Sequence, residues 1–165
     1  MKKLYICRHG KSSWKFNDLS DFERPLNKRG ERDAPKIGEV LNGKKVSPDI
    51  ILSSPAKRAF TTAKTIVKKL GRSADEIERK EELYGASAGE IMSIIQELPE
   101  DADSVMIFGH NPGLTTLNNV LSDKRIDNLP TCGVAALKLN IDKWKEIDFG
   151  CGKEMFFEYP KKYFK

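Results

Sequence analysis

The sequence predicts an α/β fold, a three-layer sandwich in which helices cover both faces of a mostly parallel sheet with an antiparallel edge. Short apolar runs alternate with helical patterns three times over residues 3–121, an order typical of parallel strands joined by right-handed helical crossovers. Beyond residue 130 the apolar runs follow one another at short intervals, which favours antiparallel strands joined by short turns. The chain length suits one such domain, and we expect a single domain over residues 1–165.

The N-terminal segment is expected to form a strand, a loop and a helix. Residues 3–8 are a buried strand, whereas residues 11–22 follow no regular period and should form a loop over the end of that strand. Asn27 is a suitable N-cap for the next helix, because its side chain can accept a hydrogen bond from a free backbone N–H. Pro35 either bends this helix or begins its regular part, since proline has no backbone N–H to donate.

A second strand and a second helix follow. Residues 48–52 form the strand, and the helix should begin with Ser54 as N-cap and Pro55 at the first helical position. The helix ends at Gly71. Arg58 lies in or just past the first turn, where a cation opposes the helix dipole, so its position favours a bound anion nearby.

The remaining segments continue the alternation. Asn111 and Pro112 should begin a helix in the way that Ser54 and Pro55 do. We expect, in order, a linking segment with a short strand around 78–85, a helix over 91–98, a strand over 104–108, the helix after Pro112, and strands over 134–139, 144–149 and 154–159.

Four basic side chains close or follow strands that should end at the same edge of the sheet. Arg8 and His9 close the first strand, Arg58 follows the second, and His110 closes a third. Ligands of open α/β sheets bind in the crevice beyond the carboxyl ends of the strands. These four residues, which include both histidines of the chain, should therefore meet in one crevice.

Arginine and histidine in one crevice favour phosphoryl transfer. Arginine presents a fixed fork of donors that suits phosphate oxygens, and it stays charged at physiological pH. A histidine beside two guanidiniums should stay neutral and keep a nitrogen lone pair, which makes it a nucleophile. We expect His9 to attack phosphorus in line while Arg8, Arg58 and His110 bind the equatorial oxygens. Water then hydrolyses the phosphohistidine intermediate.

The motifs around these residues are RHG at 8–10, SSPAKR at 53–58 followed by TA at 62–63, and GHN at 109–111. In this order they resemble the signature of the histidine phosphatase superfamily, which includes phosphoglycerate mutases and acid phosphatases. The N-terminal part, RHGKSSW at 8–14 with DFERPLNKRG at 21–30 and DAP at 33–35, is similar more narrowly to the small bacterial SixA-type phosphohistidine phosphatases. The resemblance covers nearly the whole chain.

This resemblance implies that His9 is the phosphorylated residue. It also implies that Arg8, Arg58 and His110 form the phosphate pocket, and Ser12, within the matching motif, is expected as a further substrate contact. Neither a metal ion nor a cofactor is implied. The expected partner is a phosphorylated protein or a small phosphate substrate.

The sequence departs from the mutase-like branch of the superfamily at two points. That branch usually has asparagine six residues after the nucleophile, where this chain has Lys15. It also has a glutamate general acid four residues before a glycine; Glu81 stands four residues before Gly85, with Glu82 beside it, so either is a candidate proton donor. A weak or missing acid would suit phosphohistidine, or another good leaving group, better than an alkyl phosphate.

Two other functions use the same motifs. A small-molecule phosphate monoesterase or a mutase would share the nucleophile, although only 23 positions separate Arg58 from Glu81, which leaves little room for insertions that enclose a sugar phosphate. A noncatalytic phosphate-binding module is the third reading, and it would not need the nucleophile His9. Turnover of a phosphorylated histidine domain, set against small phosphate esters, separates these functions.

The composition argues against several other classes. Cys7, Cys132 and Cys151 are an odd number without CxxC spacing, which is unlike a disulfide framework or a zinc site. The net charge of +5 comes from lysines spread along the chain, so we do not expect nucleic-acid binding. The N-terminal apolar run ends at Arg8, too early for a signal peptide. We expect a cytoplasmic protein without a membrane partner.

Overall fold

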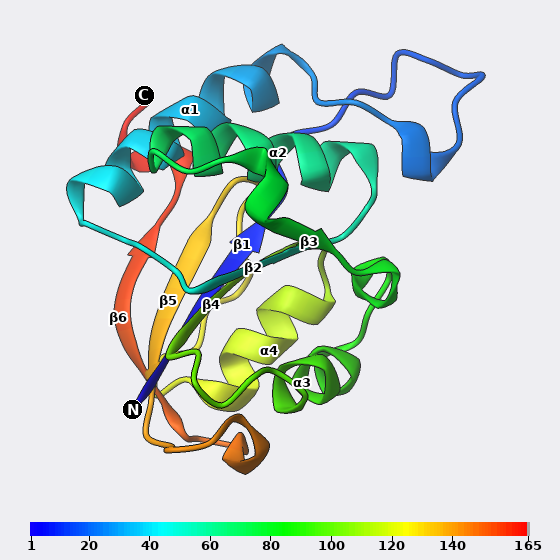
Figure 1. Cartoon of the computed structure of the whole chain (residues 1–165). Helices are drawn as coiled ribbons and strands as arrows, with labels where there is room; N and C mark the ends of the chain where they lie inside the picture. The colour runs from blue at the N-terminus through cyan, green and yellow to red at the C-terminus, as the bar shows by residue number, and fades with distance from the viewer. Residues whose placement is uncertain (165) are drawn as a thin grey trace.

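A computed structural model describes residues 1–164, in which a six-stranded mixed sheet has helices on both faces (Figure 1). The strands are β1 (Lys2–Arg8), β2 (Ile50–Ser53), β3 (Ile77–Arg79), β4 (Ser104–Gly109), β5 (Val134–Leu139) and β6 (Gly152–Glu158). The α-helices are α1 (Lys28–Gly43), α2 (Lys57–Lys69), α3 (Ala88–Gln96) and α4 (Gly113–Leu121). Among the described residues, none of these helices has the length and apolar character needed to traverse a bilayer.

The strand order is β3-β2-β4-β1-β5-β6. β1 and β2 each pair in parallel with β4, and β3 pairs in parallel with β2. β5 runs antiparallel to β1, and β6 runs antiparallel to β5. The predicted sandwich with a mostly parallel sheet and an antiparallel edge is confirmed. Because β1, β2 and β4 are parallel, their C-terminal ends lie at one edge of the sheet.

The apolar run of β1 is continuous because both of its faces are covered. Leu4 and Ile6 belong to the core that α3 and α4 cover, whereas Tyr5 and Cys7 belong to the core that α1 and α2 cover. Successive side chains of a strand point to opposite faces, so a strand buried on both sides needs apolar residues at every position. Leu4 and Ile6 are both fully buried, and each such side chain stabilises the fold by about 1.5–3 kcal/mol relative to an exposed one.

Helix α1 begins where the sequence predicts. The Asn27 side chain accepts a hydrogen bond from the Gly30 backbone N–H at 2.9 Å, as an N-cap does. Pro35 lies inside the helix, seven positions after its first residue. Gly30 is required for a close approach, because a Cβ at this position would overlap the backbone carbonyl of Lys11. This contact fixes the start of the loop that carries Ser12.

Helix α2 begins two residues later than predicted. Ala56 occupies the N-cap position, and Lys57 is the first helical residue, so Pro55 lies before the helix. Ser54 Oγ accepts a hydrogen bond from the Ala56 backbone N–H at 3.2 Å. The serine therefore stabilises the turn between β2 and α2 and does not cap the helix. Its hydroxyl also remains close to the sheet edge.

Helix α4 also begins later than predicted. Its first residue is Gly113, and Pro112 takes the N-cap position that the sequence assigned to Asn111. Asn111 nevertheless contributes to the helix start, since its Oδ1 accepts a hydrogen bond from the Thr115 backbone N–H at 3.2 Å. The segment after β4 therefore turns sharply into a helix at the edge where the site is expected.

The strand predicted over residues 144–149 is wrong. This segment begins with the 3-10 turn η4 (Trp144–Glu146) and continues without regular structure. Trp144 is fully buried and its Nε1 donates to the Ala102 carbonyl oxygen at 2.9 Å, and Ile147 is also buried. The apolar residues of this segment therefore close one end of the core and do not extend the sheet.

Candidate active site

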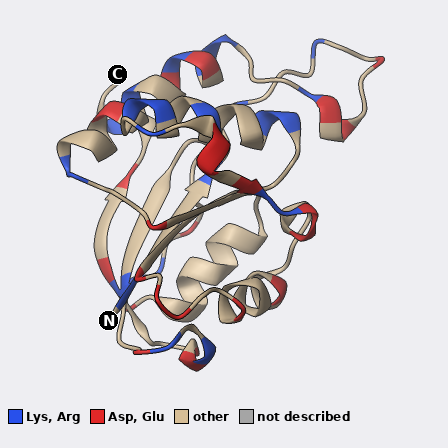
Figure 2. Cartoon of the chain, in the orientation of Figure 1, with Lys and Arg blue, Asp and Glu red and all other residues tan. Residues whose placement is uncertain are grey.

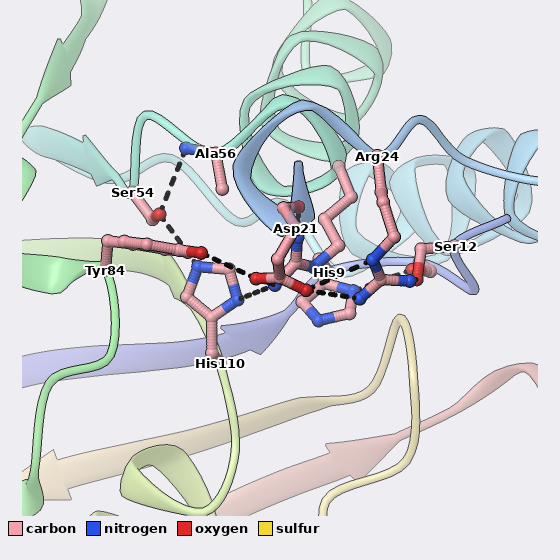
Figure 3. A network of polar contacts seen from close by, with 10 residues as sticks. His9, Ser12, Asp21, Arg24, Ser54, Ala56, Tyr84 and His110 are labelled. Carbon is pink, nitrogen blue, oxygen red and sulfur yellow. Dashed lines mark hydrogen bonds and ion pairs between the residues drawn. The ribbon is translucent and has the colours of Figure 1, made fainter. Parts of the chain in front are cut away.

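The register of the sheet brings the two histidines together. Arg8 is paired with Gly109 across β1 and β4, and the His9 backbone N–H donates to the Gly109 carbonyl oxygen at 3.3 Å. His110 follows Gly109, and the centroids of the two imidazole rings are 5.1 Å apart (Figure 3). Arg58, from the first turn of α2, places Nη2 3.5 Å from His110 Nδ1. The structure thus brings these four predicted residues to one place.

These side chains line a cavity of about 270 Å³ at the C-terminal edge of the parallel strands. Cations predominate in its lining: Lys11 and Arg24 add to the two predicted arginines, and no carboxylate is among the lining residues. Such a cavity attracts an anion. The five side chains predicted to attack or bind the substrate all line it: Arg8, His9, Ser12, Arg58 and His110.

His9 is held in the tautomer that leaves Nε2 free. Its Nδ1 lies 2.7 Å from the Gly10 carbonyl oxygen, which can only accept a hydrogen bond, so Nδ1 carries the proton. Burial lowers the pKa of His9 to about 3; the bond to Gly10 opposes this, and His110, Arg58 and Arg8 lower the pKa further. The ring is therefore neutral at physiological pH, with its lone pair on Nε2.

His110 has the opposite arrangement of its ring nitrogens. Arg58 can only donate, so Nδ1 of His110 is the acceptor, and the Nε2–H group donates to Ser54 Oγ at 2.8 Å. Burial, followed by the charge of Arg58, lowers the pKa of His110 to about 4, while Asp21 partly opposes this. A phosphate dianion in the cavity favours the protonated ring, whose Nδ1–H can then donate to a phosphate oxygen.

The two predicted arginines keep unpaired donors. Arg58 Nη1 donates to the Asp21 carbonyl oxygen at 2.6 Å, and Arg8 Nη1 donates to the Leu129 carbonyl oxygen at 3.0 Å. The Nε atoms of both arginines are buried and have no hydrogen-bond partner within residues 1–164. Burial and the charge of Arg58 lower the pKa of Arg8. Unpaired buried donors and two neighbouring cations both destabilise the cavity. An oxyanion offsets both effects, since it accepts hydrogen bonds from the guanidinium groups and relieves the repulsion between them.

Asp21 and Tyr84 belong to a polar network at the cavity that the sequence did not indicate (Figure 3). Asp21 accepts hydrogen bonds from the Tyr84 hydroxyl at 2.6 Å, from Arg24 Nη2 at 2.9 Å and from Arg58 Nη2 at 3.1 Å. The bond from Tyr84, then the bond from Arg24 and the charge of Arg58, hold the pKa of Asp21 well below its usual range. Asp21 is therefore a carboxylate that fixes two guanidiniums.

Arg24 adds a third guanidinium to the cavity. Its Nη1 donates to Ser12 Oγ at 2.6 Å, and the Trp14 ring covers it, with 3.6 Å between the guanidinium carbon and the ring centroid. Ser12 Oγ accepts from Arg24, so the hydroxyl proton of Ser12 is free to donate to a substrate oxygen. The segment RPL at 24–26 belongs to the SixA-like motif, but nothing in that pattern indicates where the arginine points.

The structure brings neither Glu81 nor Glu82 to the cavity. Both belong to the 3-10 turn η3 (Glu81–Leu83), both are exposed, and neither lines the cavity. Glu82 lines a separate and larger hollow of about 560 Å³ beside α3, together with Glu78, Glu90 and Glu97. Four glutamates against one lysine, Lys80, repel phosphate, so the smaller cationic cavity is the candidate site. The arrangement does not support a role for Glu81 or Glu82 as proton donor.

The described residues hold no group of three or more His, Cys, Asp or Glu side chains that could bind a metal ion. The three cysteines are unpaired, and Cys7 and Cys132 are buried. Burial raises the pKa of both of these thiols, so they stay protonated at neutral pH and are poor nucleophiles. Cys7 therefore packs in the core beside Arg8 and is not a candidate nucleophile.

The two histidines are expected to titrate far below the usual pH 6.5. Burial places their pKa values at about 3 for His9 and about 4 for His110. The unfolded chain binds these protons near pH 6.5, so the free energy of unfolding should fall as pH decreases from 6.5 toward 4. Imidazole NMR can measure the titration midpoint of each ring separately, because the chain has only these two histidines. Midpoints near 6.5 in the phosphate-free protein would show that the rings are not buried as described.

The chain belongs to the histidine phosphatase superfamily: the family model of branch 1 of that superfamily matches residues 4–122. More narrowly, its fold is of the SixA type. It matches the SixA protein of Agrobacterium tumefaciens with a TM-score of 0.79 and 28% identity, over 96% of this chain and 98% of that one. It matches the protein histidine phosphatase SixA complexed with tungstate with a TM-score of 0.82 and 24% identity, over 97% and 98% of the two chains. An uncharacterized protein of Mycobacterium tuberculosis is 30% identical over 93% of this chain and 99% of its own length.

Proposed function

We propose that the protein is a phosphohistidine phosphatase that needs no metal and that works through a phosphohistidine intermediate on His9. The observation that carries this proposal is the neutral His9 ring, whose Nδ1–H is bound to Gly10 and whose Nε2 is free. This ring shares a cationic cavity with Arg8 and Arg58. The likeness to SixA proteins supports phosphohistidine on a protein as the substrate.

In the first step the Nε2 lone pair of His9 attacks phosphorus in line with the bond to the leaving nitrogen. A P–N bond to His9 forms while the P–N bond of the substrate breaks, and the electron pair of the broken bond goes to the substrate imidazole. Arg8, Arg58 and protonated His110 donate to the equatorial oxygens and stabilise their charge. The bond from Nδ1–H to the Gly10 carbonyl stabilises the positive charge that the His9 ring gains.

An imidazole leaving group suits a cavity without a carboxylic acid. When the second nitrogen of the substrate ring is protonated, the ring leaves as neutral imidazole and takes no proton from the enzyme. An alkyl phosphate loses a strongly basic alkoxide and needs a general acid. Asp21, the carboxylate bound to Arg58, is ionised and cannot supply that proton. The site therefore favours phosphohistidine over alkyl phosphates.

In the second step water attacks the phosphorus of phosphorylated His9. The P–O bond forms, the P–N bond breaks, and the electron pair returns to Nε2, so His9 is regenerated as a neutral ring. The protons of water remain on the inorganic phosphate that leaves. Arg24 and Ser12, which also line the cavity, hold phosphate oxygens in both steps.

The proposed partner is a phosphorylated protein in the cytoplasm. The three cysteines are unpaired, as is usual in a reducing compartment. Figure 2 shows basic and acidic residues interspersed along α1 and the loop before it, unlike the one-signed face of a nucleic-acid-binding protein. The cavity itself is lined by four cationic side chains, Arg8, Lys11, Arg24 and Arg58.

A substrate comparison tests the proposed function. We expect kcat/KM for a protein phosphorylated on histidine to exceed that for glycerol phosphate by about 100-fold or more, since only the second substrate needs a general acid. Phosphate release is measured for both, with enzyme-free hydrolysis subtracted, and EDTA should leave both rates unchanged. A preference for the alkyl ester would indicate a small-molecule monoesterase. Phosphate binding without turnover of either substrate would indicate the noncatalytic module.

A further inference from the structure

Three aromatic side chains beside the cavity have no part in the proposed chemistry. Trp14 is 73% exposed, Phe22 is 40% exposed and Tyr84 is 38% exposed. They come from two segments far apart in the sequence, the loop between β1 and α1 and the residue after η3, and we call them the aromatic rim. Single exposed aromatic residues are ordinary on protein surfaces, whereas grouped ones mark interaction sites. Phe22 and Tyr84 contact each other, and Trp14 is connected to them through Arg24 and Asp21.

Contacts join the aromatic rim to the cavity. The Phe22 and Tyr84 rings meet edge to face with centroids 5.2 Å apart, and the Tyr84 ring is 5.5 Å from the His110 ring. Trp14 lines the cavity itself and stacks on Arg24. The blue loop and the green η3 project from the same side of the molecule in Figure 1. A partner seated on the rim therefore reaches the substrate position as well.

Asp21 holds the aromatic rim in a fixed arrangement. Its carboxylate accepts from the Tyr84 hydroxyl at 2.6 Å and from Arg24 at 2.9 Å, and its backbone carbonyl accepts from Arg58 at 2.6 Å. Phe22 follows Asp21 directly in the 3-10 turn η1 (Asp21–Glu23). An aromatic surface that is already ordered loses little conformational entropy on binding. Tryptophan and tyrosine are enriched among the residues that dominate binding at protein interfaces, and phenylalanine is enriched at interfaces in general.

The size and chemistry of the rim indicate what covers it. Phe22 is not among the residues that line the cavity, so a small phosphate inside the cavity leaves it exposed. A phosphohistidine attached to a protein enters the cavity and brings the surrounding protein surface against the rim. The complementary surface carries phosphate where the cations lie and apolar side chains where the aromatic rings lie.

We propose that the aromatic rim is a docking surface for the protein that carries the phosphohistidine, and that it binds apolar side chains next to the modified histidine. This inference rests on the proposed function and adds that the enzyme recognises protein surface around the phosphate. Removing an aromatic side chain of the rim should therefore lower kcat/KM for the protein substrate and leave kcat/KM for free phosphohistidine unchanged.

The variant Phe22→Ala tests the docking surface with two probes. One is a histidine phosphotransfer domain phosphorylated with phosphoramidate, and the other is the free amino acid phosphohistidine. We expect kcat/KM for the phosphorylated domain to fall by about tenfold or more, mainly through KM, and kcat/KM for free phosphohistidine to stay within about twofold.

Phe149→Ala is the matched control. Phe149 is 76% exposed and follows η4, at the end of the sheet where β1 begins beside the end of β5. This end is opposite to the cavity. The control variant should change turnover of neither probe, whereas turnover of free phosphohistidine reports that Phe22→Ala is folded.

Three outcomes contradict the docking surface. Equal losses on both probes would overturn it, because Phe22 would then act on the site through Tyr84. No loss on either probe would overturn it as well. If the unaltered enzyme hydrolyses small phosphates and not the phosphorylated domain, the proposed function fails first and the docking surface fails with it.

Discussion

Replacing His9 by alanine is expected to lower kcat by about 10⁴-fold or more, because it removes the proposed nucleophile. His110 cannot take over, since its Nε2–H is committed to Ser54 and its Nδ1, which accepts from Arg58 in the free protein, is protonated when phosphate is bound. Of the two rings, only His9 donates its Nδ1–H to a backbone carbonyl and keeps the lone pair of Nε2 free. Release of phosphate from a histidine-phosphorylated protein, measured at saturating substrate, gives the loss directly.

The loss in His9→Ala must be distinguished from loss of the fold. Arg8 and Arg58 keep their own partners, the backbone carbonyls of Leu129 and Asp21. The variant should therefore still bind tungstate and inorganic phosphate, which can be followed by calorimetry, and it should unfold cooperatively on heating. A folded, anion-binding His9→Ala protein that keeps its turnover would contradict the assignment of His9.

Replacing Arg58 by alanine is expected to lower kcat/KM by about 10²–10³-fold, as loss of a donor to a developing oxyanion does. Its guanidinium contacts the Asp21 backbone, the Asp21 carboxylate and His110, so one side chain orders much of the site. Its charge also helps to keep His110 neutral. The pKa of His110 should therefore rise in this variant, and imidazole NMR can record that rise beside the kinetics.

Two further variants show whether charge alone explains the role of Arg58. Arg58→Lys should recover little activity, because an ammonium is a point charge and cannot replace the planar fork of donors. Arg72→Ala is the matched control, since Arg72 pairs with Glu76 outside the cavity, and its kcat/KM should stay within about twofold of the unaltered value. Full recovery by lysine would show that only a positive charge is needed.

Sequence patterns were sufficient to predict that the residues at the strand ends lie together. Arg8, His9 and His110 close apolar runs, and the alternation of strands with helices implies parallel pairing, so their meeting at one edge needs no knowledge of side-chain packing. The register between β1 and β4 then places the rings next to each other. Arg58 was predicted to lie at the same crevice for a different reason, because a cation at the start of a helix indicates a bound anion nearby.

Loop residues could not be predicted in the same way. Asp21, Arg24 and Tyr84 lie in segments without a regular period, where the direction of a side chain depends on contacts with distant residues. Glu81 has the spacing of a general acid, yet sequence spacing does not determine which way a 3-10 turn presents its side chains. The segment at Trp144 was wrongly predicted as a strand for a related reason, because a buried aromatic residue is compatible with a strand or with a turn that covers the core.

The most direct test of the catalytic role of His9 is to identify the residue that carries phosphate during turnover. Enzyme and radiolabelled phosphohistidine protein are mixed, quenched rapidly in base, where phosphohistidine is stable and acyl phosphates are not, and digested for mass spectrometry. We expect phosphate on Nε2 of His9 and none in the His9→Ala variant. Phosphate on His110, or complete turnover with no phosphorylated enzyme at any quench time, would contradict a His9 intermediate.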